Sequence, residues 1–110
     1  MGYYLYQLSY TPEAMKAMIA KPSDREAAAR KLIEAAGGKM HHLFFCFGKY
    51  DVVVLAEAND DKTMMAVSTA VAASGTVAGG VTTKLFSHAD AMAALALAGK
   101  ITGSYKTPMV

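Results

Sequence analysis

Two neighbouring segments in the middle of the chain are apolar on both faces of the strands that they predict. The first, KMHHLFFCF at residues 39–47, carries apolar or aromatic side chains at odd and even positions alike. The second, DVVVLA at residues 51–56, is a β-branched run typical of a strand covered on both sides. A short turn, Gly48-Lys49-Tyr50, separates them. We therefore predict an antiparallel hairpin that no single layer of helices can shield from water.

The segments around this hairpin predict a regular order of strands and helices. Strands are expected over residues 3–10, 39–47, 51–56 and 77–86, and helices over 12–19, 23–36, 60–74 and 88–98. The last three helices would begin at a capping box of Ser23 with Glu26, at Asn59 and at Ser87. The order predicts an α+β protein, a ferredoxin-like βαββαβ fold with an antiparallel four-stranded sheet and an added C-terminal helix. Residues 1–98 form this domain, and the tail at 99–110 is expected to be extended or packed on a neighbouring subunit.

The helices of such a fold cover only one face of the sheet. The second apolar face needs another cover, and the same face of a second copy can provide it, because stacked sheets bury whole faces at a spacing of about 10 Å. Identical chains usually associate with closed symmetry. The sequence therefore predicts a homodimer or a higher homo-oligomer.

Composition and charge exclude several other classes of protein. The 110 residues suffice for one domain, and the net charge of +2 comes from basic residues interleaved with acidic ones, which leaves no basic patch for nucleic acid. No apolar run reaches the roughly 20 residues that span a bilayer, so no membrane is expected. Without a recognisable leader the chain is expected to be cytoplasmic. The single cysteine, Cys46, cannot form an internal disulfide, and its aromatic flanks predict a buried, unreactive thiol.

Four landmarks, in this order, resemble those of the GYD domain family. They are Tyr10-Thr11, Gly37-Gly38-Lys39, the signature Gly48-Lys49-Tyr50-Asp51, and Ala58-Asn59-Asp60. The resemblance runs from about residue 3 to residue 86, departs from the usual Pro-Asp at Asn59-Asp60, and does not cover the tail after about Leu97. It implies a ferredoxin-like domain of the dimeric α/β barrel group, without an established activity. Relatives of that architecture include ligand-sensing domains of Lrp-like regulators and small cofactor-independent monooxygenases and isomerases.

A metal site is not expected from the histidines of the first hairpin strand. Neighbouring residues of a strand point to opposite faces, so His41 and His42 would not chelate one ion. His42 and Cys46 share a face, but four residues place them about 13 Å apart, beyond the reach of two ligands on one zinc. No cofactor is expected either, because no glycine-rich phosphate loop is present.

Two functional hypotheses remain open. The first is a binding or sensing module for a small apolar or aromatic molecule, with Tyr6, His42, Tyr50 and Asp51 as candidate ligand-binding residues. The second is a cofactor-independent enzyme in which His42, Asp51 or His88 moves a proton; no supporting third residue can be assigned, so the enzymatic role stays undecided. A pocket that holds His42 or His88 beside Asp51 or a tyrosine would favour the enzyme, and a pocket lined by Met, Phe and Ala would favour binding.

Two groups of residues also have structural interpretations. The Asp51 carboxylate is suited to accept backbone N–H groups of its turn, and Gly48 to supply a positive φ. The tyrosines at positions 4, 6 and 10 share one face of the first strand, where they would line either a pocket or the dimer interface; the interface is favoured because tyrosine is enriched there.

Overall fold

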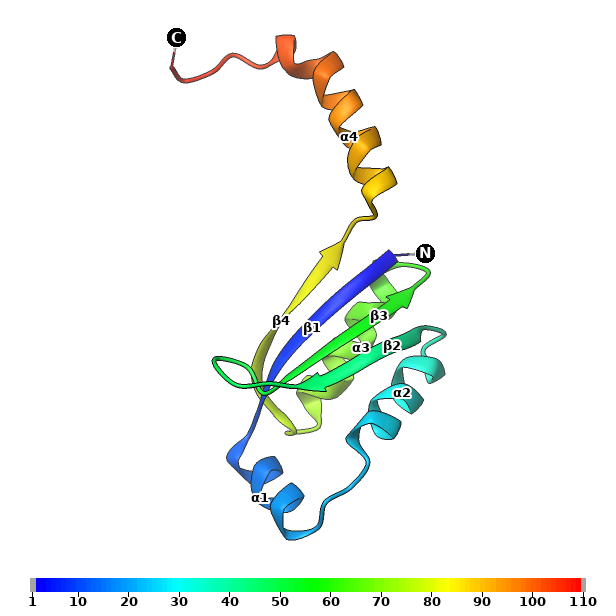
Figure 1. Cartoon of the computed structure of the whole chain (residues 1–110), viewed down its shortest axis with the longest axis vertical. Helices are drawn as coiled ribbons and strands as arrows, with labels where there is room; N and C mark the ends of the chain where they lie inside the picture. Colours follow the sequence, from blue (N-terminus) through cyan, green and yellow to red (C-terminus); the bar gives the residue numbers. More distant parts are fainter. Residues whose placement is uncertain (1, 110) are drawn as a thin grey trace.

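The computed structural model describes residues 2–109 and has the predicted order of elements. Its strands are β1 (Gly2–Tyr10), β2 (Lys39–Phe45), β3 (Val52–Ala58) and β4 (Val77–Leu85), and its helices are α1 (Pro12–Ala20), α2 (Arg25–Ala35), α3 (Asp61–Ala73) and α4 (His88–Ile101), followed by a 3₁₀ turn (Thr102–Ser104). The sheet order is β2-β3-β1-β4, and every neighbouring pair is antiparallel. Helices α2 and α3 lie on one face of this sheet (Figure 1). The α+β, ferredoxin-like prediction is confirmed.

Side-chain caps fix where the helices begin, and two of them differ from the prediction. Asp24, not Ser23, caps α2, because its Oδ1 accepts the backbone N–H of Ala27 at 2.9 Å. Asp60, not Asn59, caps α3 by accepting the N–H of Thr63 at 2.8 Å. In both cases the cap lies one residue later than predicted. The carboxylate of each capping aspartate is also stabilised by the positive end of the helix dipole.

A β-bulge in β2 changes which side chains share a face. Met40 pairs with Ala56, whereas His42 pairs with Leu55, so one extra residue stands between them. Beyond the bulge, His42 and Phe44 are opposite Leu55 and Val53, on the face away from the helices. The strict alternation expected from residue 39 onward is therefore wrong after Met40.

The core lies between the sheet and the two helices. Its buried members are Tyr4, Tyr6, Ile33, Met40, Val52, Val54, Ala56, Ala58, Met64 and Val67. Tyr4 and Tyr6 are each only 4% exposed. They pack inside one subunit, so the predicted dimer-interface role of these two tyrosines is wrong. The tyrosines fill the space beneath α3, where a phenol ring adds burial energy and its hydroxyl finds a partner.

The opposite face of the sheet has no covering layer within residues 2–109. We call it the open face and define it by ten side chains, which are Tyr3, Leu5, Gln7, His42, Phe44, Val53, Leu55, Val81, Thr83 and Leu85. Leu5 and Leu55 pair directly across β1 and β3 at its centre. The exposed fractions of Phe44 and Val81 are 62% and 44%. The prediction that the two strands of the hairpin carry apolar side chains on both faces is thus confirmed.

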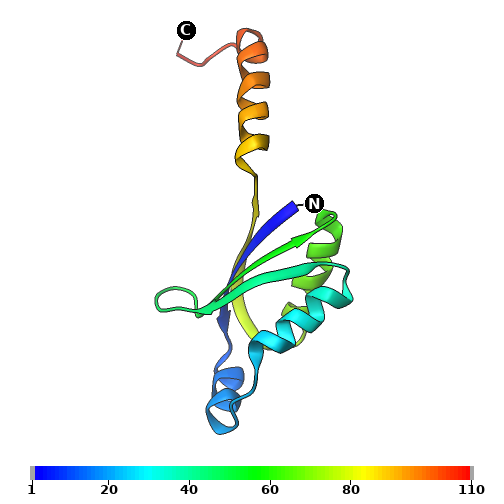
Figure 2. The ribbon, with the colours of Figure 1, turned by 45° about the vertical axis from the view of Figure 1, so that its right-hand side comes forward.

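The last helix lies away from the sheet. It begins at the predicted cap, Ser87, but continues through Gly99 to Ile101, so the predicted end before Gly99 is wrong. Figure 2 shows α4 extending beyond the end of β4, with the C-terminal residues farther out. No helix among the described residues is long and apolar enough to cross a membrane.

Candidate functional site

A cavity of about 420 Å³ lies between α2, α3 and the covered face of the sheet. It is lined by Tyr6, Leu8, Ala29, Leu32, Ile33, Val54, Val67, Ser68, Val71, Ala72, Val77, Ala78, Gly79, Gly80 and Thr82. Helix α2 packs against β2 and helix α3 against β3 and β4, and the cavity occupies the space between the two helices. The volume is within the range of small-molecule sites, and the lining is mainly aliphatic with a few hydroxyl groups.

The close approach of β1 and β4 at the edge of the cavity requires glycine at position 80. A side chain at Gly80 would come within 2.5 Å of the Gln7 carbonyl oxygen and 2.6 Å of the Leu8 side chain. Gly79 has nothing within 4 Å of its missing Cβ. Next to this pair the register of β1 and β4 shifts between Ser9 and Tyr10, an irregularity of the kind that glycines inside a strand often accompany.

Three hydroxyl groups in the lining of the apolar cavity could orient a bound molecule. The Tyr6 hydroxyl donates a hydrogen bond to the Met64 carbonyl at 2.9 Å. The Ser68 and Thr82 hydroxyl oxygens lie 3.3 Å apart across α3 and β4. Burial raises the pKa of Tyr6, an effect that the hydrogen bond with Ser68 partly offsets. Tyr6 is therefore a neutral donor at any ordinary pH.

A second hollow of about 270 Å³ continues the cavity toward the beginning of α2. It shares Leu8, Ala29 and Val71 with the first, and Arg25 is the charged side chain in its lining. Burial raises the pKa of Tyr10, and the neighbouring Arg25 partly opposes this. Within residues 2–109 Arg25 forms no ion pair. A half-buried guanidinium thus lies at one end of an apolar groove.

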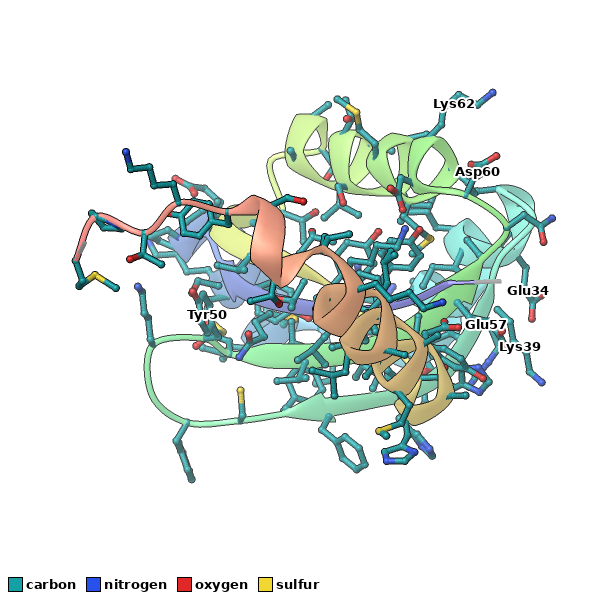
Figure 3. The ribbon with its side chains drawn as sticks, turned by 90° about the horizontal axis from the view of Figure 1, so that it is seen from above. Glu34, Lys39, Tyr50, Glu57, Asp60 and Lys62 are labelled. Atoms are coloured by element: carbon teal, nitrogen blue, oxygen red, sulfur yellow. The ribbon has the colours of Figure 1, made fainter. Side chains whose placement is uncertain are left out.

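Of the predicted ligand-binding residues, Tyr6 alone lines the cavity. Tyr50 and Asp51 lie in the β2–β3 hairpin, and Figure 3 shows Tyr50 at the opposite end of the sheet from Glu57. The Asp51 carboxylate accepts the backbone N–H of Tyr10 at 2.9 Å, and the Asp51 N–H donates to the Leu8 carbonyl at 2.8 Å. Asp51 therefore attaches the hairpin to β1, rather than bonding within its own turn as expected. Gly48 has the predicted positive φ, 106°.

The three catalytic candidates are not brought together. His42 stacks on Phe44 on the open face, with ring centroids 5.9 Å apart. His88 is the first residue of α4, outside the sheet, and Asp51 is occupied by the Tyr10 N–H. None of these histidines lines the cavity between sheet and helices.

The bulge also changes the faces of the sheet to which His41 and His42 point. His41 Nε2 is 2.8 Å from Glu57 Oε1, and the His41 ring lies 5.7 Å from that of Tyr3, so it shares the open-face side with His42. The prediction that these neighbours point to opposite faces is wrong at this position. Across residues 2–109 no group of three metal-ligating side chains gathers around either ring.

Cys46 differs from its prediction. Strand β2 ends at Phe45, so Cys46 and Phe47 lie in the hairpin loop and Cys46 is exposed. Its Sγ lies 3.2 Å from the Tyr50 carbonyl. The aromatic neighbours do not bury the thiol, because they are themselves exposed at the end of the strand: Phe45 by 60% and Phe47 fully.

A polar cluster that sequence reasoning missed lies at the edge of α3. The Tyr4 hydroxyl donates to Asp61 Oδ1, and the Lys84 ammonium donates to the same oxygen at 2.8 Å. Lys84 is opposite Tyr4 in the β1–β4 register. The hydrogen bond to Asp61, followed by burial and the Asp61 charge, raises the pKa of Tyr4 to about 12. The hydrogen bonds from Lys84 and then Tyr4 lower the pKa of Asp61. Only the strand register, which the residue pattern does not specify, reveals this cluster.

Replacing Asp61 with asparagine is expected to lower the Tyr4 pKa from about 12 toward its ordinary value of 10.0. The variant loses both the charged acceptor and its repulsion of the phenolate. A spectrophotometric phenolate titration measures the shift. Asp60→Asn is the matched control, because Asp60 acts on Tyr4 only through space and asparagine still caps α3. An unshifted tyrosine titration in Asp61→Asn would contradict the cluster.

The raised pKa of Tyr4 also makes the free energy of unfolding depend on pH. Because the folded state holds the Tyr4 proton more tightly than the unfolded chain, this contribution to stability is complete below pH 10 and is lost as the pH rises toward about 12. In the Tyr4→Phe variant, the free energy of unfolding should therefore fall less steeply between pH 10 and about pH 12 than in the native chain, as measured by chemical denaturation at several pH values.

Solved structures resemble this chain in fold. FFRP-DM1 matches with a TM-score of 0.50 and 13% identity, over 78% of this chain and 100% of its own. MtbAldR matches with a TM-score of 0.56 and 14% identity, over 79% of this chain and 55% of its own, so the chain spans about half of that protein. TTHA0845 from Thermus thermophilus matches with a TM-score of 0.52 and 18% identity, over 79% of this chain and 95% of its own. No curated protein sequence matches significantly.

The family itself is identified by a sequence model. The model described as GYD domain matches residues 4–105, which is nearly the whole chain and includes α4. The expected end of the resemblance near residue 86 was therefore too early. The landmarks around Gly48 and Asp51, the ferredoxin-like sheet and this match agree: the chain belongs to the GYD domain family.

Proposed function

We propose that this protein is a homo-oligomeric module that binds a small apolar or aromatic molecule between its sheet and helices α2 and α3. The apolar cavity of about 420 Å³ carries the proposal. The sheet supplies its floor, and helices α2 and α3 supply its walls. Apolar sites of this size bind by burying the ligand surface, while the few hydroxyls determine its orientation.

The lining favours binding over catalysis. It contains aliphatic side chains, Tyr6, Ser68 and Thr82, but no histidine or carboxylate. A proton-transfer enzyme needs an acid or base within hydrogen-bond reach of the substrate. The ligand-sensing relatives implied by the family resemblance agree with a binding role.

The adjoining hollow suggests which small molecules to test first. Arg25 places a positive charge at the end of the groove. A guanidinium binds carboxylates well, often through two parallel hydrogen bonds. Small aromatic or aliphatic acids, with the apolar part over Ala29 and the carboxylate toward Arg25, fit both ends of the site.

The assembly part of the proposal rests on the open face. Its centre, at Leu5 and Leu55, is apolar, and its margin carries the polar pair His41 and Glu57. An apolar centre with a polar margin is typical of protein interfaces. A second copy whose open face packs against the first gives the dimeric α/β barrel. We also propose a cytoplasmic location and, on the charge pattern given above, no binding to nucleic acid.

Binding is tested by thermal denaturation with a panel of aromatic and aliphatic acids and their neutral amides. A specific ligand at 100 times its dissociation constant stabilises the folded state by about 2.7 kcal/mol. We expect at least one acid to raise the unfolding midpoint in the native chain. Ala29→Phe should abolish the shift, because Ala29 lines both hollows and the larger ring fills them.

Ala27→Phe is the matched control, since Ala27 is exposed on the same helix and lines neither hollow. It should respond to the ligand as the native chain does. Arg25→Gln should weaken the binding of the acid but leave the binding of the neutral amide unchanged. A ligand that stabilises Ala29→Phe as strongly as the native chain binds elsewhere and contradicts this site. The absence of stabilisation by any compound also counts against the binding role.

A further inference from the structure

Helix α4 is exposed along its whole length. Every residue from Phe86 to Lys106 is exposed, including the large apolar side chains. Met92 and Leu95 point to one side of the helix, while Leu97 and Ile101 lie about half a turn away by helical spacing. Their exposed fractions are between 51% and 64%. Alanine fills most remaining positions, and Asp90 and Lys100 are the charged residues. A helix that is apolar on all sides is normally buried.

The size of the chain shows how much surface this leaves uncovered. The radius of gyration is 18.0 Å, whereas a compact domain of this length has about 13 Å. The accessible surface is 7792 Å², about 2,000 Å² more than the roughly 5,800 Å² expected for a folded monomer of this mass. Obligate dimers bury about 1,000–2,500 Å² on each subunit. The excess surface of one chain therefore matches what one subunit buries in a permanent dimer.

The helix also needs a docking surface in order to persist. Isolated helices of fewer than about 12–15 residues are marginal in water even when rich in alanine, and α4 has 14 residues with Gly99 near its end. Figures 1 and 2 show that α4 does not lie on its own sheet. A membrane does not suit it, because 14 residues are too few to span a bilayer. It also lacks the charged face of an interfacial helix.

We infer that α4 is an arm that packs on a second copy of this chain, so that each subunit of the dimer buries the α4 of the other. This inference rests on the proposed dimer. A second copy is the partner that offers α4 an apolar surface: Phe45 and Phe47 at the end of β2 are exposed outside the open face and remain for α4 when two open faces pack together. Closed two-fold symmetry buries both arms in two equal contacts.

Amide hydrogen exchange of the full chain, followed by mass spectrometry at several protein concentrations, tests the inference. We expect the α4 amides to be protected when the protein is dimeric and to lose protection on dilution. An undocked helix of this length would exchange nearly as fast as an unfolded segment. The oligomeric state is measured on the same samples by light scattering.

Leu95→Glu should expose α4 to exchange at every concentration and shift the protein toward smaller species. Ala66→Glu adds the same charge at an exposed position of α3 and should change neither measurement. A dimer whose α4 amides are unprotected overturns the arm and leaves the proposed dimer intact. A chain that stays monomeric at all concentrations overturns both. Protection that does not depend on concentration, in a monomer, would mean that α4 folds back on its own domain, and it also contradicts the arm.

Discussion

Replacing Met64 with alanine should lower the free energy of unfolding by about 2–5 kcal/mol, the usual cost of truncating a large buried side chain. Met64 is 1% exposed and lies at the centre of the packing between α3 and the sheet. Alanine leaves the space beneath α3 empty, and this space adjoins the Tyr6 ring, whose hydroxyl is held by the Met64 carbonyl. Chemical denaturation at fixed protein concentration measures the change.

The neighbouring methionine provides a matched control. Met65 lies on the same helix but is 72% exposed, so Met65→Ala should change the free energy of unfolding by no more than about 0.5 kcal/mol. Helix propensity favours alanine slightly in both variants and cancels in the comparison. Equal effects of the two substitutions would contradict the placement of α3, because they would mean that Met64 is no more buried than Met65.

Replacing Leu55 with aspartate should dissociate the assembly. Leu55 lies in the centre of the open face, paired with Leu5 on β1 and with His42 on β2. A carboxylate there would be buried without a partner in the dimer but hydrated in the monomer. The substitution should therefore weaken association more than it weakens folding of the subunit. Central interface residues contribute at least about 2 kcal/mol, which corresponds to a dissociation constant raised by about 30-fold. Sedimentation at several concentrations measures it.

Two further variants separate loss of association from loss of folding. Phe44→Asp, on the edge strand β2 and 62% exposed, should weaken the assembly without disturbing the sheet centre. Met65→Asp adds the same charge on the outer side of α3 and should leave the assembly unchanged. Circular dichroism establishes that each variant is folded. Folded Leu55→Asp and Phe44→Asp chains that associate as tightly as the native protein would exclude the open face as the interface.

The fold could be predicted because local signals agreed along the chain. The apolar runs at 39–47 and 51–56 specified a hairpin, and the acids and hydroxyls before each helix specified where it begins to within a residue. The face of each residue in β2 could not be predicted, because the bulge after Met40 depends on pairing with Ala56 and Leu55. One extra residue was enough to reverse the expected placement of His42 relative to His41.

The site was harder to predict than the fold. Tyr6 was selected from its aromatic strand, but the cavity lies in the space between α2 and α3, and no residue pattern specifies the distance between two helices. Arg25 looked like one charge of an alternating helical surface, and its position at the end of the groove appears only in three dimensions. Asp51 carried the strongest signal, yet its carboxylate accepts the Tyr10 N–H, so it attaches the hairpin to β1 and does not line the cavity.

The molar mass of the native chain in solution at micromolar concentration, measured by sedimentation equilibrium, distinguishes a free subunit from an assembly. We expect a dimer or a larger closed assembly, because the open face and α4 leave apolar surface that a second copy covers. A single species of 11.6 kDa across that concentration range would contradict it. Both the interface on the open face and the exchanged arm would then have to be abandoned.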